Sequence, residues 1–308
     1  MGAVSGLGDS YDLPNYVGEL FHVTPADTPF LSMIGGLSGG VKTTSKQFTW
    51  QTVDNVAAAQ PAITEGADAT FAERSRSEVI NVCQIHQEGV HVSYTKQGAV
   101  GNLSGQAILG EQPVQNEVDF QRKLKMEKIA RDVEISFLDG AYVADTDVST
   151  ARKSRGLLTA ISTNTVAGAS ARLNKDMIDE LLREMANSGA PFRNVVVFAN
   201  AFQRQRISAI YGYAPQSRNV GGLSINQIET DFGMLGVAYD RHMPTDELLL
   251  AEVSVCKPRF LEIPGKGFLF MEPLGKSGSA DKFQIYGEVG LEYGPEQWHG
   301  TVTGLATA

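Results

Sequence analysis

"KQFTWQTV" (residues 46–53) and "EVINVCQIHQEGVHVSY" (residues 78–94) alternate polar and apolar residues, the pattern that is typical of β-strands. The connection between them, residues 54–76, reads "DNVAAAQPAITEGADATFAERSR", with small and polar side chains and little apolar surface to bury. Compact domains rarely contain so long a connection unless it acts outside the domain. The two segments therefore predict a long β-hairpin that projects from the body of the protein.

A long helix is predicted downstream of this hairpin, over residues 113–140, "PVQNEVDFQRKLKMEKIARDVEISFLDG". Proline suits the first position of a helix and glycine its end, so Pro113 and Gly140 are the expected boundaries. At 1.5 Å per residue such a helix would extend roughly 40 Å. Its apolar residues form one stripe, which consists of Val118, Met126, Ile129, Val133 and Phe137.

The first 40 residues have little core of their own and are predicted to form an arm. Within them, "TPADTPFLSMIGG" (24–36) places Thr28 to cap a short helix, Pro29 at its first position and two glycines at its end. A helix this short is unstable alone, so its apolar face must dock on the chain itself or on a neighbour. We expect Phe30 and Leu31 to be buried at a subunit or domain junction.

The remaining chain shows two kinds of sequence pattern. Over 156–257, helical and strand patterns alternate: Asn174 and Asn200 are placed to cap helices, and "NVVVFA" (194–199) is a buried strand. Over 258–308, strand patterns return, separated by turns rich in glycine and proline. The fold class is therefore α+β, with an α/β lobe inserted before a final β segment.

Composition excludes several classes of protein. The 308 residues are 42% hydrophobic and 20% charged, as in ordinary globular proteins. The net charge of −9 argues against a dedicated nucleic-acid-binding protein. The two cysteines, Cys83 and Cys256, have neither zinc-site spacing nor a disulfide framework, which fits a reducing compartment. We expect no signal peptide and no membrane contact, because no basic, apolar leader and no long apolar run is present.

A glycine-rich motif at residues 36–40, "GLSGG", imitates the nucleophile elbow of serine hydrolases around Ser38. An elbow needs a buried strand before it and a helix after it, and neither is predicted here. The same residues nearly form a phosphate-binding loop, but Val41 occupies the position of its second glycine and no helix follows. A glycine-rich hinge is the better interpretation.

No metal or cofactor site is predicted. Cys83, His86 and His91 are close in sequence, but Cys83 and His91 would lie roughly 26 Å apart on one strand and His86 on its other face. "DTDVST" (145–150) begins like a calcium loop and lacks its central glycine and final glutamate, so it predicts a polar turn. We therefore expect no catalytic residues and no cofactor.

The order of arm, projecting hairpin, long helix, α/β lobe and returning β segment resembles the major capsid proteins of tailed phages, the family with the Hong Kong 97 type fold. "TPADTPFLSMIGG" is similar to the arm motif of one branch of this family. "EPLGKSGSADKFQIYGEVGLEYGPEQWHGTVTGL" (272–305) is similar to that branch's C-terminal run, in which a glycine-rich turn precedes a long strand and a His-Gly pair.

This resemblance implies a role for each segment. The N-terminal arm would reach over neighbouring subunits, the extended loop would lie across the adjacent subunit, and the spine helix would belong to a peripheral domain at local threefold contacts. The axial domain would pack around the fivefold and sixfold axes. The implied boundaries are arm 1–40, extended loop 41–95, peripheral domain 96–155, axial domain 156–257 and return to the peripheral domain 258–308.

The resemblance also implies the function and the partners. Pentamers and hexamers of the chain would form the icosahedral head shell of a virion, assembled in the host cytoplasm around double-stranded DNA. A portal and a separate scaffold protein would be partners, and a decoration protein is a further candidate. The acidic net charge suits an inner face that does not hold the DNA tightly or read its sequence.

Inter-subunit contacts are expected at aromatic and apolar residues of the arm and the loop, because such residues are enriched at interfaces. The candidates are Phe30, Leu31, Phe48, Trp50 and Phe71. Some relatives join lysine to asparagine between subunits, which would make Lys42 and Lys46 candidates on the extended loop. We favour an unlinked shell, since no asparagine partner is identified.

Two alternatives to a phage capsid remain at this stage. An encapsulin-like nanocompartment shell has the same fold and would hold cargo enzymes in a cell. A serine hydrolase using Ser38 is the alternative from another class, and it would be a small globular enzyme.

Overall fold

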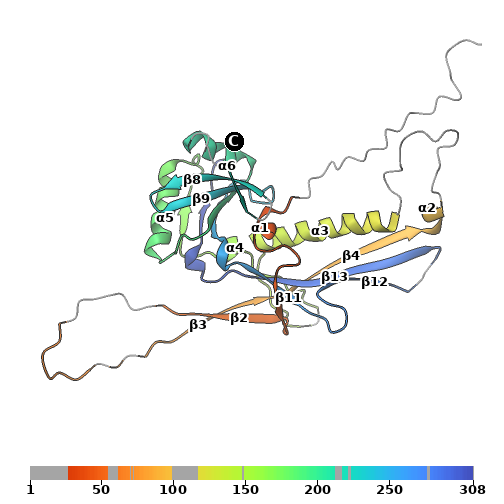
Figure 1. The fold of residues 1–308 in the computed structure, drawn as a ribbon, viewed down its shortest axis with the longest axis horizontal. Coiled ribbons are helices and arrows are strands. Elements are labelled where there is room, and N and C mark those ends of the chain that lie inside the picture. Colours follow the sequence, from red (N-terminus) through yellow and green to blue (C-terminus); the bar gives the residue numbers. More distant parts are fainter. Residues whose placement is uncertain are drawn as a thin grey trace, which may run out of the picture.

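The computed structural model describes residues 27–54, 62–69, 71, 73–98, 117–147, 149–211, 217–220, 223–275 and 278–307. Residues 1–26, and with them most of the predicted arm, lie outside the described residues. Two sheets organise the described chain: a long five-stranded sheet with one helix along it, and a seven-stranded sheet that forms a separate lobe (Figure 1).

The five-stranded sheet is built around β13 (Ala280–Glu292). This strand pairs antiparallel with β4 (Gln84–Ser93), β12 (Leu269–Pro273) and β11 (Lys257–Leu261). The short strand β1 (Val41–Thr43) adds to β11 in parallel. Segments from the beginning, the first third and the end of the chain therefore meet in one sheet.

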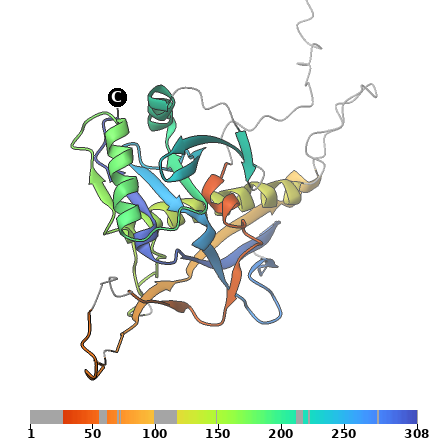
Figure 2. The ribbon, with the colours of Figure 1, turned by 60° about the vertical axis from the view of Figure 1, so that its left-hand side comes forward.

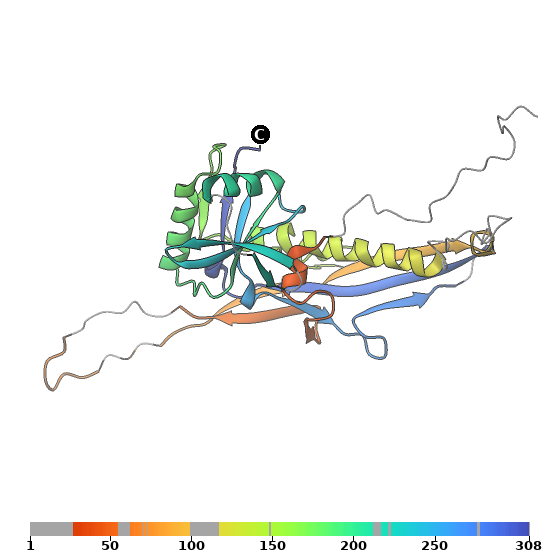
Figure 3. The ribbon, with the colours of Figure 1, turned by 45° about the horizontal axis from the view of Figure 1, so that its top comes forward.

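The long helix α3 (Glu117–Asp139) lies along β4 and β13 (Figure 3). This confirms the predicted helix from Glu117 onward, while residues 113–116 lie outside the described part. The C-terminal part of the predicted stripe, Ile129, Val133 and Phe137, is buried in the core. Gly140 follows the last residue, where its N–H donates to the Ser136 carbonyl.

The second sheet forms the α/β lobe, which Figure 2 shows from another side. Its strand order is β5 (Thr165–Ala167), β14 (Gly300–Thr303), β10 (Leu248–Glu252), β6 (Val195–Ala199), β9 (Gly233–Tyr239), β8 (Leu223–Thr230) and β7 (Ser217–Val220). Every residue of β6 and β10 is buried, as expected for the central strands of a covered sheet.

Two capped helices belong to this lobe, α5 (Lys175–Asn187) and α6 (Ala201–Tyr211). The side chain of Asn174 accepts the N–H of Met177 at 2.9 Å, and that of Asn200 accepts the N–H of Gln203 at 3.0 Å. Both predicted caps are therefore confirmed. The helices of the described residues include none long and apolar enough to cross a membrane.

The final segment divides between the two sheets. Strands β11, β12 and β13 belong to the five-stranded sheet, as expected for a segment that returns to the first layer. The last strand, β14, lies in the seven-stranded sheet instead, between β5 and β10. The segment 258–308 thus differs from the predicted return at its end, where β10 and β5 pair with the backbone of β14 on both sides.

The projecting hairpin consists of β2 (Gln47–Thr52) and β3 (Ser77–Val82), paired antiparallel from Gln47 with Val82 to Thr52 with Ser77. Figures 1 and 3 show it leaving the body on the side opposite to the far end of α3. The single strand pattern predicted over 78–94 is divided at Cys83. The N–H of this residue donates to the Lys46 carbonyl, so the chain leaves the hairpin there and joins the five-stranded sheet as β4.

Candidate assembly site

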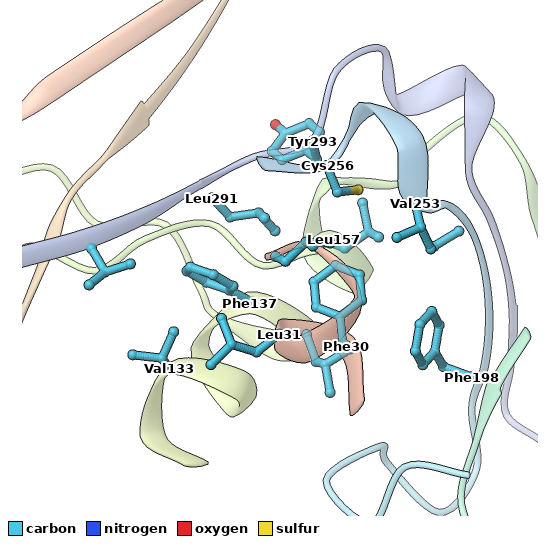
Figure 4. Close-up of a cluster of buried hydrophobic side chains, with 14 of the residues drawn as sticks. Phe30, Leu31, Val133, Phe137, Leu157, Phe198, Val253, Cys256, Leu291 and Tyr293 are labelled. Atoms are coloured by element: carbon cyan, nitrogen blue, oxygen red, sulfur yellow. The ribbon is translucent and has the colours of Figure 1, made fainter. Parts of the chain in front are cut away.

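The short helix α1 (Pro29–Met33) lies where the long helix and the seven-stranded sheet meet. Phe30 and Leu31 are 0% and 2% exposed, and Figure 4 shows them among side chains of both parts. The ring of Phe30 meets that of Phe198 edge to face, with centroids 5.3 Å apart. The arm is thus anchored in the core of its own chain, at the junction between the two sheets.

The N-terminus of α1 is capped from a distant helix. The backbone N–H groups of Phe30 and Leu31 donate to the two carboxylate oxygens of Glu134, each at 2.7 Å. Thr28 occupies the predicted N-cap position, but its side chain makes no capping hydrogen bond. The buried carboxylate of Glu134 occupies the place where a Thr28 cap would act, and a charged acceptor binds backbone N–H groups more strongly.

A glycine-rich turn connects α1 to β1. Gly35 and Gly36 have φ values of +114° and +68°, which ordinary residues rarely adopt. A Cβ on Gly40 would lie 2.1 Å from the ring of Phe260, so only glycine lets the chain pass there. Ser38 is exposed on this turn, and within the described residues it has no hydrogen bond to a histidine or an acid. The motif at 36–40 is a hinge.

The base of the hairpin is fixed by a buried asparagine, Asn81, which is 0% exposed. Its amide nitrogen donates to the carbonyls of Leu291 at 2.7 Å and Arg155 at 3.2 Å. Its side-chain oxygen accepts the N–H of Arg155 at 2.8 Å and that of Val82 at 2.9 Å. One side chain therefore joins the hairpin to β13 and to the segment before α4 (Leu157–Ala160).

A charged network surrounds the point where the hairpin leaves the body. The guanidinium of Arg152 donates to the Cys83 carbonyl at 2.6 Å and forms an ion pair with Glu288 of β13. Asp145 lies 3.8 Å from Arg152 and 2.8 Å from the Nζ of Lys46, which precedes β2. These contacts fix the direction of the hairpin relative to the five-stranded sheet.

Two of the predicted contact residues, Phe48 and Trp50, pack at the base of the hairpin. Phe48 is 9% exposed and stacks on Trp50. The indole of Trp50 meets the Tyr293 ring edge to face at 4.9 Å, and its N–H donates to the Gly294 carbonyl at 2.9 Å. Phe48 is thus covered by its own chain, and the half-buried Trp50 packs on it and on Tyr293.

The far part of the hairpin has the opposite character. Phe71 is 94% exposed and Ile63 is 72% exposed, and the other described residues of 62–76 are exposed as well. Of the five predicted contact residues, Phe71 alone presents most of its side chain to solvent. The lysines proposed for a cross-link are partly exposed and ion-paired, Lys42 with Glu262 and Lys46 with Asp145, each at 2.8 Å.

The residues considered for a metal site are not brought together. Within the described residues, no group of three or more histidine, cysteine or acidic side chains could hold a metal ion. His86 is buried and His91 exposed on opposite faces of β4, as predicted. Burial raises the pKa of the Cys83 thiol to about 12, so it stays protonated. At 145–150, Asp147 accepts hydrogen bonds from Ser149 and Thr150, which closes the predicted polar turn.

A buried histidine joins the ends of the two sheets. His299 is 0% exposed; its Nδ1 accepts the N–H of Glu252 at 3.2 Å, and its Nε2 lies 2.7 Å from the Tyr293 carbonyl. One ring nitrogen must accept and the other donate, so the imidazole is neutral. Burial lowers its pKa to about 4, and the same cause lowers the pKa of His86 to about 4.

Three solved structures are similar to the chain over nearly its whole length. The capsid asymmetric unit of cyanophage A-1(L) matches with a TM-score of 0.69 and 12% identity, covering 99% of this chain and 100% of that one. The capsid of the native GTA particle matches with a TM-score of 0.63 and 12% identity, covering 99% of this chain and 99% of that one. The SrpI encapsulin of Synechococcus elongatus matches with a TM-score of 0.62 and 13% identity, covering 96% of this chain and 93% of that one. No curated protein matches the sequence.

The projecting hairpin, the long helix beside β13 and the α/β lobe define a shell protein with the Hong Kong 97 type fold. A model of the SU10 major capsid protein family matches residues 3–306, and the chain belongs to this family. It is a major capsid protein that forms the shell of a phage head, so its place is the virion capsid. It is a structural protein, which rules out the alternative of a hydrolase using Ser38.

Proposed function

We propose that the chain assembles as pentamers and hexamers, and that the exposed part of the hairpin is the contact each subunit makes with its neighbour. The observation that carries this proposal is the exposure of Phe71 and Ile63, 94% and 72%, on a hairpin whose base is fixed by its own chain. Large apolar side chains exposed at the end of a projection are typical of surfaces that become buried on association.

The segments then take distinct roles. Residues 1–40 are the arm and 41–95 the extended loop. Residues 96–155 and the strands β11 to β13 form the peripheral domain, with α3 as its spine. Residues 156–257, together with β14, form the axial domain around the fivefold and sixfold axes. The division into two sheets supports this assignment.

Of the predicted contact residues, we retain Phe71 as an inter-subunit contact. Phe30, Leu31, Phe48 and Trp50 act indirectly, because their burial within the chain holds the arm and the loop in position. The shell encloses double-stranded DNA, which its acidic subunits face without reading its sequence. A portal, a separate scaffold protein and a decoration protein are the proposed partners, and assembly takes place in the host cytoplasm.

Electron microscopy of the purified protein tests the assembly, and a pair of variants tests the contact. Phe71→Ala removes most of the exposed aromatic surface, and we expect fewer complete shells at equal protein concentration. Glu65→Gln, on the same exposed stretch, changes no apolar area and should assemble as the unsubstituted protein does. Equal yields of shells from Phe71→Ala and Glu65→Gln would refute the contact, and a small globular species from the unsubstituted protein would refute the assembly.

Denaturing gels of boiled shells test the cross-link that Lys42 or Lys46 would form. A ladder of bands would indicate covalent joining. We expect a single band near 33.2 kDa, the mass of one chain.

A further inference from the structure

The Glu134 carboxylate that caps α1 has a second buried carboxyl group beside it, that of Asp240. The shell architecture does not require this second group. Asp240 follows β9 and is 0% exposed, as is Glu134. Each of the two side chains acts on the pKa of the other as a close neighbour within reach of a hydrogen bond. Two carboxylates cannot share a buried contact while both are charged, so this hydrogen bond requires a proton.

The surrounding hydrogen bonds decide which residue holds the proton. Both oxygens of Glu134 already accept backbone N–H groups, from Phe30 and Leu31, and these donors favour the ionised form. In Asp240, Oδ1 accepts the N–H of His242 at 2.8 Å, while the buried Oδ2 has no donor among the described residues. A hydroxyl at Oδ2 that donates to Glu134 satisfies every oxygen of the pair.

We propose that Asp240 carries a proton which it donates to the Glu134 carboxylate, and that loss of this proton releases α1 from the junction of the two sheets. The protonated pair therefore keeps α1, and with it the arm, docked. It connects three parts of the chain: α1 through its N–H groups, α3 through Glu134, and the seven-stranded sheet through Asp240, whose N–H donates to the Ala199 carbonyl of β6 at 2.9 Å.

The charged groups around the pair do not supply another partner. Helix α1 and strand β6 contain no ionisable side chain. On α3 the nearest charged residues are Arg131 and Asp132, and neither shifts the pKa of Glu134. His242, two residues after Asp240, is the one further group whose charge acts on the pair, and it favours the ionised form of Asp240. Burial is the main cause that raises the pKa of both carboxyl groups.

The direction of the pH effect follows from the number of protons bound. With α1 docked the pair holds one proton, whereas two solvated carboxyl groups hold none above about pH 5. Docking therefore weakens as the pH rises, by up to about tenfold in the equilibrium constant per pH unit, until the docked pair also loses its proton. Where the pH is low enough to protonate the Glu134 carboxylate as well, the cap on α1 weakens again.

Amide hydrogen exchange of the full-length protein tests whether the docking of α1 depends on this proton. The measured quantity is the protection factor of residues 28–34, corrected for the intrinsic pH dependence of exchange, at pH 5 to 9. We expect protection to fall by more than tenfold over this range. Peptides from β6 serve as the internal reference for the global fold, and their protection should change much less. Constant protection of 28–34 in the unsubstituted protein would overturn the proposal, whatever the variants do.

Asp240→Asn is the decisive variant, because its amide donates to Glu134 at every pH as the protonated acid does. We expect the protection of 28–34 to become independent of pH in this variant. Asp231→Asn makes the same chemical change on an exposed turn and should leave the pH profile unaltered. If Asp240→Asn kept the pH dependence of the unsubstituted protein, the proton would not reside on Asp240 and the proposal would fail.

Discussion

The base and the far part of the hairpin differ in almost every physical respect: the base consists of the paired strands, and the far part is the connection between them. At the base, Asn81 is fully buried and each of its polar atoms is hydrogen-bonded. Further out, Phe71 exposes 94% of its side chain, and the other described residues of 62–76 are exposed as well. The chain thus fixes the direction of the projection itself, and the proposed contact with a neighbour lies at its end.

This difference separates two kinds of residue that look alike in the sequence. Phe48, Trp50 and Phe71 are all aromatic residues of one extended loop, yet the first two pack at the base and the third is exposed. Substitutions at the base should therefore act on the stability of the subunit, and substitutions at the end should act on assembly. The following experiments test that division, in order of decreasing effect on subunit stability.

Asn81→Leu should have the largest effect. The leucine removes the partners of several buried backbone groups, each of which costs about 1–3 kcal/mol when left unpaired, so we expect a loss of about 3 kcal/mol or more in the free energy of unfolding. Urea unfolding of dissociated subunits measures it. Asn187→Leu, at an exposed position at the end of α5, is the matched control and should change stability by less than about 0.5 kcal/mol. Similar losses in both variants would show that the base has no special role.

Acid should destabilise the subunit through its buried histidines. In the unfolded chain they bind protons near pH 6.5, whereas in the fold the pKa of His299 and that of His86 are each about 4. The stability they contribute is therefore present above pH 6.5 and is lost as the pH falls to 4, by roughly 3 kcal/mol for each histidine.

His86→Leu isolates one of these contributions, since Nε2 of His86 has no hydrogen-bond partner among the described residues. The difference in unfolding free energy between pH 7 and pH 4 should shrink by roughly 3 kcal/mol in this variant. An unchanged difference would mean that His86 titrates in the fold as it does in the unfolded chain.

Gly290→Ala should have an intermediate effect at the base. A Cβ there would lie 2.6 Å from the ring of Phe48 and 2.7 Å from the Val82 carbonyl, so the hairpin must shift. Overpacking of this kind costs about 1–3 kcal/mol. Gly89→Ala, on β4, is the control because nothing lies within 4 Å of its Cβ. A lower melting temperature for Gly290→Ala alone is the expected result, and equal melting temperatures would contradict close packing at the base.

Phe71→Ala should have the smallest effect on the subunit. The side chain is solvated, so the unfolding free energy of dissociated subunits should change by less than about 0.5 kcal/mol. The same variant is expected to reduce the yield of shells. A clear loss of subunit stability would show that Phe71 packs within its own chain, and the contrast between base and end would not hold.

Much of the fold could be predicted because its elements carry local signals. The alternation on both sides of residues 54–76 predicted the hairpin, and the stripe ending at Phe137 predicted the long helix. Asn174 and Asn200 predicted two helix starts, since a cap acts within three residues of its own position. The resemblance to phage capsid proteins then supplied the arrangement of these elements, which local patterns do not contain.

The parts that could not be predicted depend on contacts between distant residues. Glu134 lies on a helix rich in charged residues, where a glutamate normally faces solvent, and nothing in the sequence links it to an N–H group of Phe30. Asn81 similarly finds its partners at Arg155 and Leu291. Strand β14 has the same pattern as its neighbours in sequence, and only the register of a distant sheet decides where it pairs.

The position of β13 has a mechanical consequence. The arm is followed directly by β1, and β1 pairs with β11, which pairs with β13. The hydrogen bonds of such strands run across the direction of the chain. A force that pulls the arm along its strand therefore loads several bonds at once in shear, instead of opening them one after another. Tension along the long axis of β13 is therefore resisted by these hydrogen bonds together.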